Sequence, residues 1–125
     1  MQNPPSKVSL SEKFSLFGEH WTPKIIGETN GQLVKIAKVQ GEFIWHAHDN
    51  EDELFLVIRG RLVIEFRNGR VELNQGEMCI VPRGVEHRPM ADEETQILLI
   101  EPASTAHTGR HISEITVSND KQEWI

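Results

Sequence analysis

The chain of 125 residues has no tyrosine, one cysteine and no long apolar run. A single cysteine excludes an internal disulfide, and the position of Cys79 in the apolar segment MCIVP predicts a small buried side chain and not a nucleophile. No segment approaches the roughly 20 apolar residues that are needed to cross a bilayer, and the N-terminus lacks a basic region followed by an apolar one. These absences predict a cytoplasmic protein that spans no membrane.

Basic residues are also few, because 13 lysines and arginines stand against 19 aspartates and glutamates, for a formal net charge of -6. They form no run of the kind that binds a phosphate backbone, so a nucleic-acid partner is not expected. The hydrophobic fraction of 38% and the chain length are those of one globular domain that can build a core without disulfides.

Residues 1–23 are predicted to form an N-terminal arm and a short helix. The prolines at positions 4 and 5 oppose regular structure. Ser9 and Glu12 stand three residues apart, as in a capping box that opens a helix in SLSEKFSLF. His20 and Trp21 follow as a cover for one end of the domain or as a structural aromatic anchor, and we favour the anchor.

From Gly31 to Glu101 the chain divides into short β-like segments separated by glycine, asparagine and proline. Their spacing of about 8 to 12 residues is typical of an antiparallel sandwich or barrel. The pairs Asn30-Gly31 and Asn68-Gly69 supply the residues that two-residue hairpin turns require. We therefore predict one all-β domain over residues 24–102.

Two segments, ELFLVI and QILLI, are apolar at nearly every position, so strands that they form need cover on both faces. We expect the second subunit of a homodimer to supply the outer cover. Trp45 lies on the outside if His46 points inward, and it then needs cover from the N-terminal helix or from a partner subunit. The polar tail, residues 103–125, is predicted to pack on the barrel or on that partner; its His107 and His111 are not interpreted as a site.

His46 and His48 lie one residue apart in the β-like segment EFIWHAH. In a strand, residues i and i+2 share a face, whereas in a helix the two imidazoles would point about 200° apart. If the pair faces the interior it is a chelating arrangement, which needs one or two further ligands. Taken alone, the same pattern also fits two half-exposed histidines on a strand.

The acidic residues after this pair divide by position. Asp49, Glu51 and Asp52 fall in a turn, where such residues bond the local backbone, and we expect them to be solvated. Glu53 opens the next apolar strand, where a buried carboxylate requires a cation or hydrogen-bond donors. Glu53 is therefore the carboxylate expected to act with the histidines. His87 begins a strand further along, and taken alone it fits a structural or exposed histidine.

Strand alternation also places Lys38 and Gln40 on the side of His46, unless Gly41 resets the alternation. Both would then line the pocket. The alternative is an exposed lysine on the edge of a strand.

Together these residues resemble the two motifs of the cupin superfamily. The first motif appears as Gly41, His46, His48, Glu53 and Gly60, with four residues after Gly41 where the family usually has five. The second appears as Gly76, Pro82, Gly84 and His87, with Ala91 in place of a usual asparagine that is not a ligand. The chain is most similar to small single-domain cupins, including those described as similar to mannose-6-phosphate isomerase.

The resemblance implies a jelly-roll β-barrel, commonly dimeric, with one metal ion held by His46, His48, Glu53 and His87. Three imidazoles and a carboxylate suit divalent iron, manganese, nickel, cobalt or zinc and suit calcium poorly. The metal would make the protein an enzyme acting on a small polar molecule, as an oxygenase or as an isomerase or lyase. The alternative is a cupin that binds or senses a sugar or organic acid without turnover, because one fold hosts many functions.

Overall fold

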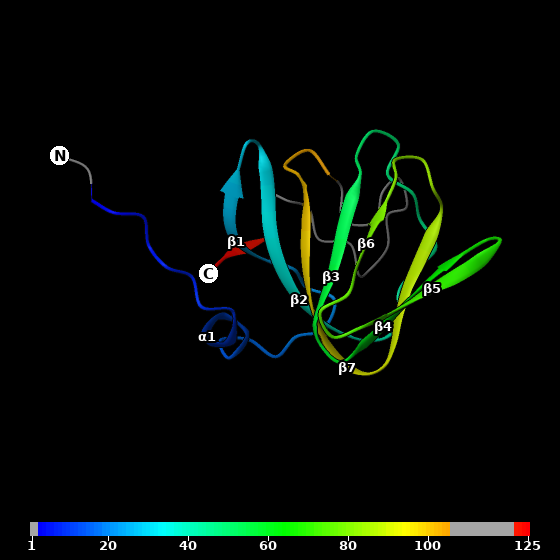
Figure 1. The fold of residues 1–125 in the computed structure, drawn as a ribbon, viewed down its shortest axis with the longest axis horizontal. Helices are drawn as coiled ribbons and strands as arrows, with labels where there is room; N and C mark the ends of the chain where they lie inside the picture. Colours follow the sequence, from blue (N-terminus) through cyan, green and yellow to red (C-terminus); the bar gives the residue numbers. More distant parts are fainter. Residues whose placement is uncertain (1–2, 106–121) are drawn as a thin grey trace.

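The computed structural model describes residues 3–105 and 122–125 and shows an all-β jelly-roll barrel preceded by one short helix (Figure 1). The elements are α1 (Leu10–Phe14), β1 (Lys24–Thr29), β2 (Gln32–Glu42), β3 (Glu53–Arg59), β4 (Arg61–Phe66), β5 (Gly69–Asn74), β6 (Met78–Val81), β7 (His87–Pro102) and β8 (Glu123–Trp124). The fold class predicted from the sequence is confirmed.

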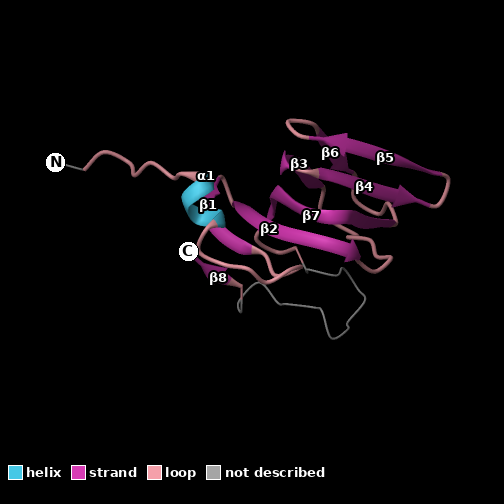
Figure 2. Cartoon of the chain, turned by 90° about the horizontal axis from the view of Figure 1, so that it is seen from below, coloured by secondary structure: helices cyan, strands magenta, loops and turns pink. Residues whose placement is uncertain are grey.

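Strand β7 joins the two halves of the barrel. Its later residues pair with β2 and β3, and its first residues pair with β4 and with the end of β2. The resulting path β5-β4-β7-β2-β1-β8 is seen in Figure 2, and β6 pairs with β3 beside it. The sequence indicated a strand that begins at His87 and, apart from it, the strand segment QILLI, but the structure has a single strand of 16 residues. The acidic segment between them, residues 92–94, is exposed and stays within the strand.

The barrel interior is filled by side chains from alternate positions of each strand, which is the period expected of a half-buried sheet. In β3, for example, Phe55 and Val57 are buried while Leu54 and Leu56 are half-buried on the outer face. The buried cluster comprises Ala37, Val39, Phe55, Val57, Leu62, Ile64, Leu73, Val81, Ala91, Ile97 and Leu99. Burial of this apolar surface is the main force that closes the barrel.

The predicted short helix is present as α1. The Ser9 hydroxyl accepts a hydrogen bond from the Glu12 backbone N–H, so Ser9 caps the helix as the sequence indicates. Phe14 is buried and anchors the helix. Across residues 3–105 and 122–125, no helix has the length and apolar character that a membrane crossing requires.

Two side chains differ from their predicted settings. Cys79 is half-buried at the edge of the core, not fully enclosed, because β6 pairs with β3 alone. Trp45 is half-buried, and its cover comes from the same chain. The guanidinium carbon of Arg67 lies 3.8 Å from the centre of the indole ring, and that of Arg88 lies 5.4 Å away. These cation–π contacts shield the indole within the described chain, and further cover from a partner subunit stays a prediction.

Candidate metal centre

His46 and His48 enter the barrel from the segment that follows β2. The sequence predicted a strand here, but the segment is not a regularly paired strand. His46 forms an isolated β-bridge with His87. The side chains nevertheless alternate: His46 and His48 are buried, and the residues between and before them are half-buried. The prediction that the two imidazoles share the inner face is therefore confirmed without a regular ladder.

The loop of the second motif holds this segment in place. The Gly84 backbone N–H donates to the His48 carbonyl over 2.7 Å, and His46 and His87 exchange two backbone hydrogen bonds of 3.0 and 2.9 Å. Gly84 has a φ of +79°, which favours glycine. The Pro82-x-Gly84 loop thus positions both motifs against each other.

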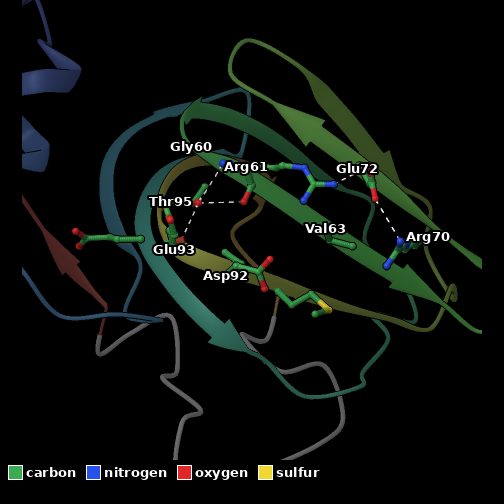
Figure 3. Close-up of a pocket in the computed structure, with 11 residues that line it drawn as sticks. Gly60, Arg61, Val63, Arg70, Glu72, Asp92, Glu93 and Thr95 are labelled. Carbon is green, nitrogen blue, oxygen red and sulfur yellow. Dashed lines mark hydrogen bonds and ion pairs between the residues drawn. The ribbon is translucent and has the colours of Figure 1, made fainter.

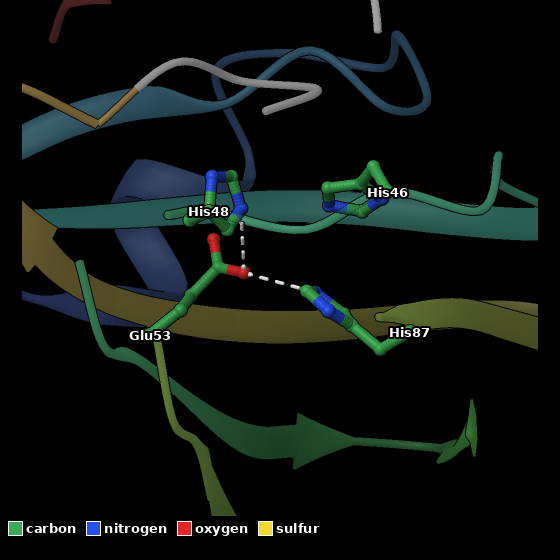
Figure 4. Close-up of side chains that lie close together, drawn as sticks. All are labelled: His46, His48, Glu53 and His87. Carbon is green, nitrogen blue, oxygen red and sulfur yellow. Dashed lines mark ion pairs between the residues drawn. The ribbon is translucent and has the colours of Figure 1, made fainter. Parts of the chain in front are cut away.

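Glu53 and His87 complete the cluster from two other strands (Figure 4). Glu53 is the first residue of β3 and His87 the first of β7, as predicted, and both are buried. The Glu53 Oε1 atom lies 3.4 Å from His48 Nε2 and 3.5 Å from His87 Nε2. Together with His46, the four side chains offer ligand atoms that all lie within 4.8 Å of one another.

This donor set fits a divalent metal ion. Nitrogen and oxygen ligands about 2.1 Å from one ion are at most about 4.2 Å apart, so a contraction of a few tenths of an ångström would close the site. His48 Nε2, His87 Nε2 and Glu53 Oε1 are all buried and have no hydrogen-bond partner in the described chain. Buried polar atoms without partners are costly, and a shared cation would satisfy all three.

Backbone carbonyls orient two of the imidazoles. His46 Nδ1 lies 2.8 Å from the Ile44 carbonyl oxygen, and His87 Nδ1 lies 2.9 Å from that of Val85. Because a carbonyl only accepts, each Nδ1 carries the proton and each Nε2 presents a lone pair to the centre. The same arrangement holds metal-binding histidines in other proteins.

Burial and neighbouring groups set the protonation states of His46 and Glu53 that cation binding requires. Desolvation, and then the neighbouring His87, lower the pKa of His46 to about 4, so the imidazole is neutral at physiological pH. Burial alone would raise the pKa of the Glu53 carboxyl, but the neighbouring Glu101, His48 and His87 side chains hold it well below its usual range. Glu53 is therefore ionised, as a metal ligand must be.

A narrow apolar pocket leads to the centre. Its open volume is about 30 Å³, which is room for one or two water molecules. His46 and Glu53 are its polar side chains, and the others that line it are Trp21, Pro23, Ala37, Val39, Phe43, Phe55, Pro89, Ile97 and Leu99. The indole of Trp21 stacks on Phe43 with ring centres 4.8 Å apart, so Trp21 forms part of the wall.

Other residues singled out in the sequence lie elsewhere. Lys38 and Gln40 do not line this pocket, because the bulge at Gly41 (φ +84°) resets the alternation of β2. Lys38 Nζ instead donates to the Phe17 carbonyl over 2.6 Å, and Gln40 is exposed. His20 is exposed and pairs with Glu94.

The acidic turn is surface, as predicted, although Glu51 is half-buried. Asp49 and Asp52 are exposed, and the Asp52 carboxylate accepts a hydrogen bond from the Arg83 backbone over 2.9 Å. His107 and His111 lie outside the described residues.

Two buried charges beside the centre were missed from the sequence. Lys35 is fully buried, and its Nζ lies 2.6 Å from Oε1 of the buried Glu101. Glu101 in turn shares a hydrogen bond with Glu53. A signal was available, since Lys35 has the parity of Leu33 and Ala37 in β2, and a lysine on a buried face calls for a partner.

A larger hollow of about 540 Å³ lies apart from these ligands, between β4, β5 and the exposed part of β7 (Figure 3). Both of its arginines pair with Glu72, and the ion pair between Arg61 and Glu72 is 2.7 Å long. Thr95 there is tied to both backbone polar groups of Arg61. None of its lining side chains has a buried polar atom without a partner, so we place the chemistry in the smaller pocket.

The barrel and its inward-facing histidines are those of a cupin. The sequence profile of the cupin domain family, Cupin_2, matches residues 32–101, and the chain belongs to this family. Over 77 residues it is 35% identical to the uncharacterized protein YdbB of Bacillus subtilis, covering 61% of this chain and 68% of YdbB.

The chain is also similar to solved structures. A cupin-2 domain containing protein of Shewanella frigidimarina is 49% identical, with a TM-score of 0.75, over 76% of this chain and 93% of that one. Protein NMB1881 of Neisseria meningitidis is 28% identical, with a TM-score of 0.72, over 78% of this chain and 99% of that one.

Proposed function

We propose that the protein is an enzyme that depends on one divalent transition-metal ion, bound by His46, His48, Glu53 and His87. The observation that carries the proposal is the set of buried ligand atoms without partners, which face one another within 4.8 Å. A cluster kept only for stability would be expected to satisfy these atoms internally. The donor types suit iron, manganese, nickel, cobalt or zinc.

The chemistry of the pocket favours an oxygenase over an isomerase or lyase. A bound iron ion would supply activation of dioxygen and of a chelating substrate. Isomerases and lyases also need groups that move protons, yet His46 and Glu53, both proposed ligands, are the titratable side chains among the described residues that line the pocket. The apolar walls exclude water and leave space of a size suited to a diatomic molecule.

We further propose that the substrate joins metal-binding oxygens to an apolar body. The pocket walls are aromatic and aliphatic, and no lysine or arginine of the described chain lines them. A phosphorylated sugar or a polycarboxylate would therefore find no countercharge there beyond the metal. A substrate larger than the open volume has to displace Trp21 or Phe43, which form the stacked part of the wall.

The metal is tested first. Protein purified without added metal is compared with a His46→Ala, His87→Ala double variant by elemental analysis. We expect close to one transition-metal ion per wild-type chain and little in the variant. A His20→Ala variant is the matched control, since His20 is exposed and pairs with Glu94 away from the centre. Equal metal content in the wild type and the double variant would refute the proposal.

Turnover is tested with the iron-loaded protein. We expect oxygen uptake with catechols or β-diketones that carry apolar groups, and none with aliphatic hydroxy acids or sugars. The competing function is a cupin that binds or senses a small molecule without turnover. Tight binding of a panel member, with no oxygen uptake and no chemical change under any of the candidate metals, would favour that function instead.

A further inference from the structure

Lys35 and Glu101 are two charged side chains inside the barrel that belong to no proposed ligand set. Lys35, on β2, is 0% exposed, and Glu101, on β7, is 3% exposed. Their Nζ and Oε1 atoms are 2.6 Å apart. Two charges are costly to remove from water, and a buried pair seldom stabilises a fold more than apolar residues would. Their presence therefore points to a role other than stability.

Strand register places this pair directly behind Glu53. Leu33 of β2 is paired with Glu101 of β7, and Lys35 follows two residues later on the same face of β2. Leu54 of β3 is paired with Ile100, so Glu53 and Glu101 occupy the next positions on adjacent strands. A hydrogen bond joins the two carboxyl groups. A continuous chain of contacts thus runs from Lys35 through Glu101 to Glu53.

The contacts from Lys35 through Glu101 to Glu53 orient the Glu53 carboxylate. Its Oε1 atom faces His48 and His87, where the ion would lie. Glu101 Oε1 is held by Lys35, while Glu101 Oε2 has no other donor among the described residues. The Glu101 carboxyl group thus lies between Lys35, whose Nζ atom is 2.6 Å from its Oε1, and Glu53 at the opposite position of the adjacent strand.

We propose that Lys35 and Glu101 are positioning residues for the metal centre: Lys35 fixes Glu101, and Glu101 holds the Glu53 carboxylate with one oxygen turned toward the ion. The inference rests on the proposed function, because it assigns these residues to that metal. Neither residue touches the ion or the substrate. Partners of this kind set the orientation of a ligand, and their loss commonly lowers metal affinity about 10- to 100-fold.

The test uses the affinity of the metal-stripped full-length protein for Co(II), measured by competition with a chelator, and the visible absorption of bound Co(II). Glu101→Leu removes the hydrogen bond, and we expect affinity to fall about 10- to 100-fold with a changed Co(II) spectrum. Glu101→Gln keeps an amide N–H for Glu53 and a carbonyl for Lys35. We expect it to stay within about threefold of wild type, with the wild-type spectrum.

Two further variants separate positioning from stability. Lys35→Met with Glu101→Leu removes both members of the buried pair together, so neither is left without its partner, and the variant is expected to fold. Its affinity is expected to fall as far as that of Glu101→Leu. Lys24→Met is the matched control, because Lys24 is also buried and pairs with Glu19 and Glu123, at another site. It is expected to keep the wild-type affinity.

The outcomes distinguish this inference from the proposed function. If the folded double variant binds Co(II) with wild-type affinity and spectrum, the positioning role is overturned while the metal site stands. If Glu101→Gln loses as much affinity as Glu101→Leu, hydrogen-bonded positioning is overturned as well. If the wild-type protein itself does not bind Co(II), the metal site fails, and this inference fails with it.

Discussion

The orientation and the protonation of single histidines in the centre already suit cation binding in the metal-free protein. His46 and His87 each direct one ring nitrogen to a backbone carbonyl, which leaves the other nitrogen unprotonated and available to the cluster of ligand atoms. An imidazole free to rotate would lose conformational entropy on binding, and fixing it in advance favours association. This preparation has a cost in the metal-free protein, because an imidazole held in a dry site cannot take up a proton freely.

That cost predicts a loss of stability in mild acid. In the folded, metal-free protein the pKa of His46 is about 4, whereas the ordinary value for histidine is 6.5. Between these values the unfolded chain binds a proton that the folded chain does not, so stability is full above pH 6.5 and falls as the pH decreases to 4. The contribution of His46 to this loss is about 3 kcal/mol.

Urea denaturation of chelator-treated protein at pH 7 and at pH 4 measures the effect. His46→Asn lacks the titrating ring, so its loss of unfolding free energy between the two pH values is expected to be smaller by about 3 kcal/mol. The carboxyl groups titrate in both proteins, so their contributions to the loss of unfolding free energy cancel in the comparison. Equal losses in the wild type and the variant would contradict the prediction.

The sequence predicts single residues well where spacing and alternation suffice. His46, His48, Glu53 and His87 were all expected, and the structure brings their ligand atoms together. The behaviour of β2 was harder to predict, because a bulge at Gly41 changes which residues face inward after it.

The contact between Lys35 and Glu101 was also difficult to predict. Lys35 and Glu101 meet only because β2 and β7 pair in a particular register. A one-residue slip of β2 against β7 would place the two side chains on opposite faces of the sheet. Nothing local to either residue specifies that register, so their contact could not be predicted from the sequence.

At the scale of elements, the long strand β7 depends on its contact with the turn between β3 and β4. Gly60 lies in this turn with a φ of +101°. A Cβ atom at this position would lie 2.7 Å from Thr95 Oγ1 and 3.2 Å from Thr95 Cα. The Thr95 hydroxyl hydrogen-bonds to the backbone of Arg61. Glycine is therefore required here for both conformation and space.

Replacing this glycine tests the contact. Gly60→Ala is expected to lower the free energy of unfolding by about 2 to 4 kcal/mol, since conformational strain and a clash with backbone add together. Gly76→Ala is the matched control, because Gly76 has a φ of +82° and a Cβ atom added there would meet no heavy atom within 4 Å. Its cost is expected to be about 1 to 2 kcal/mol. Equal costs in urea denaturation would show that the contact with Thr95 is unimportant.

The boundaries of the elements show what local patterns can and cannot indicate. The Asn30-Gly31 turn lies where its residue types place it, with positive φ at both positions. The acidic residues 92–94 lie within β7 at the point where one neighbour of the strand changes from β4 to β3. On its other side β7 stays paired with β2 across a register shift, so the strand continues through these exposed positions.

At the scale of the whole molecule, the outer side of β6, β3 and β7 presents an apolar surface. Strand pairing forms two rows across it, Met78–Leu56–Leu98 and Ile80–Leu54–Ile100. Met78 and Ile80 are 51% and 53% exposed, and the other four residues are half-buried. Isolated apolar residues are normal on a surface, but a continuous patch of this kind marks an interface. These rows contain the segments whose composition indicated a homodimer.

We predict that this surface is the contact between two copies of the chain. Light scattering after size exclusion, at micromolar concentration, is expected to give twice the 14.3 kDa chain mass. Met78→Glu with Ile80→Glu places charges on the most exposed strand of the patch, where desolvating them is costly, and is expected to give a monomer with unchanged circular dichroism and metal content. Leu16→Glu is the control, because Leu16 is 64% exposed on the N-terminal segment. A monomeric wild type, or a double variant that remains dimeric, would show that the two rows do not form the interface.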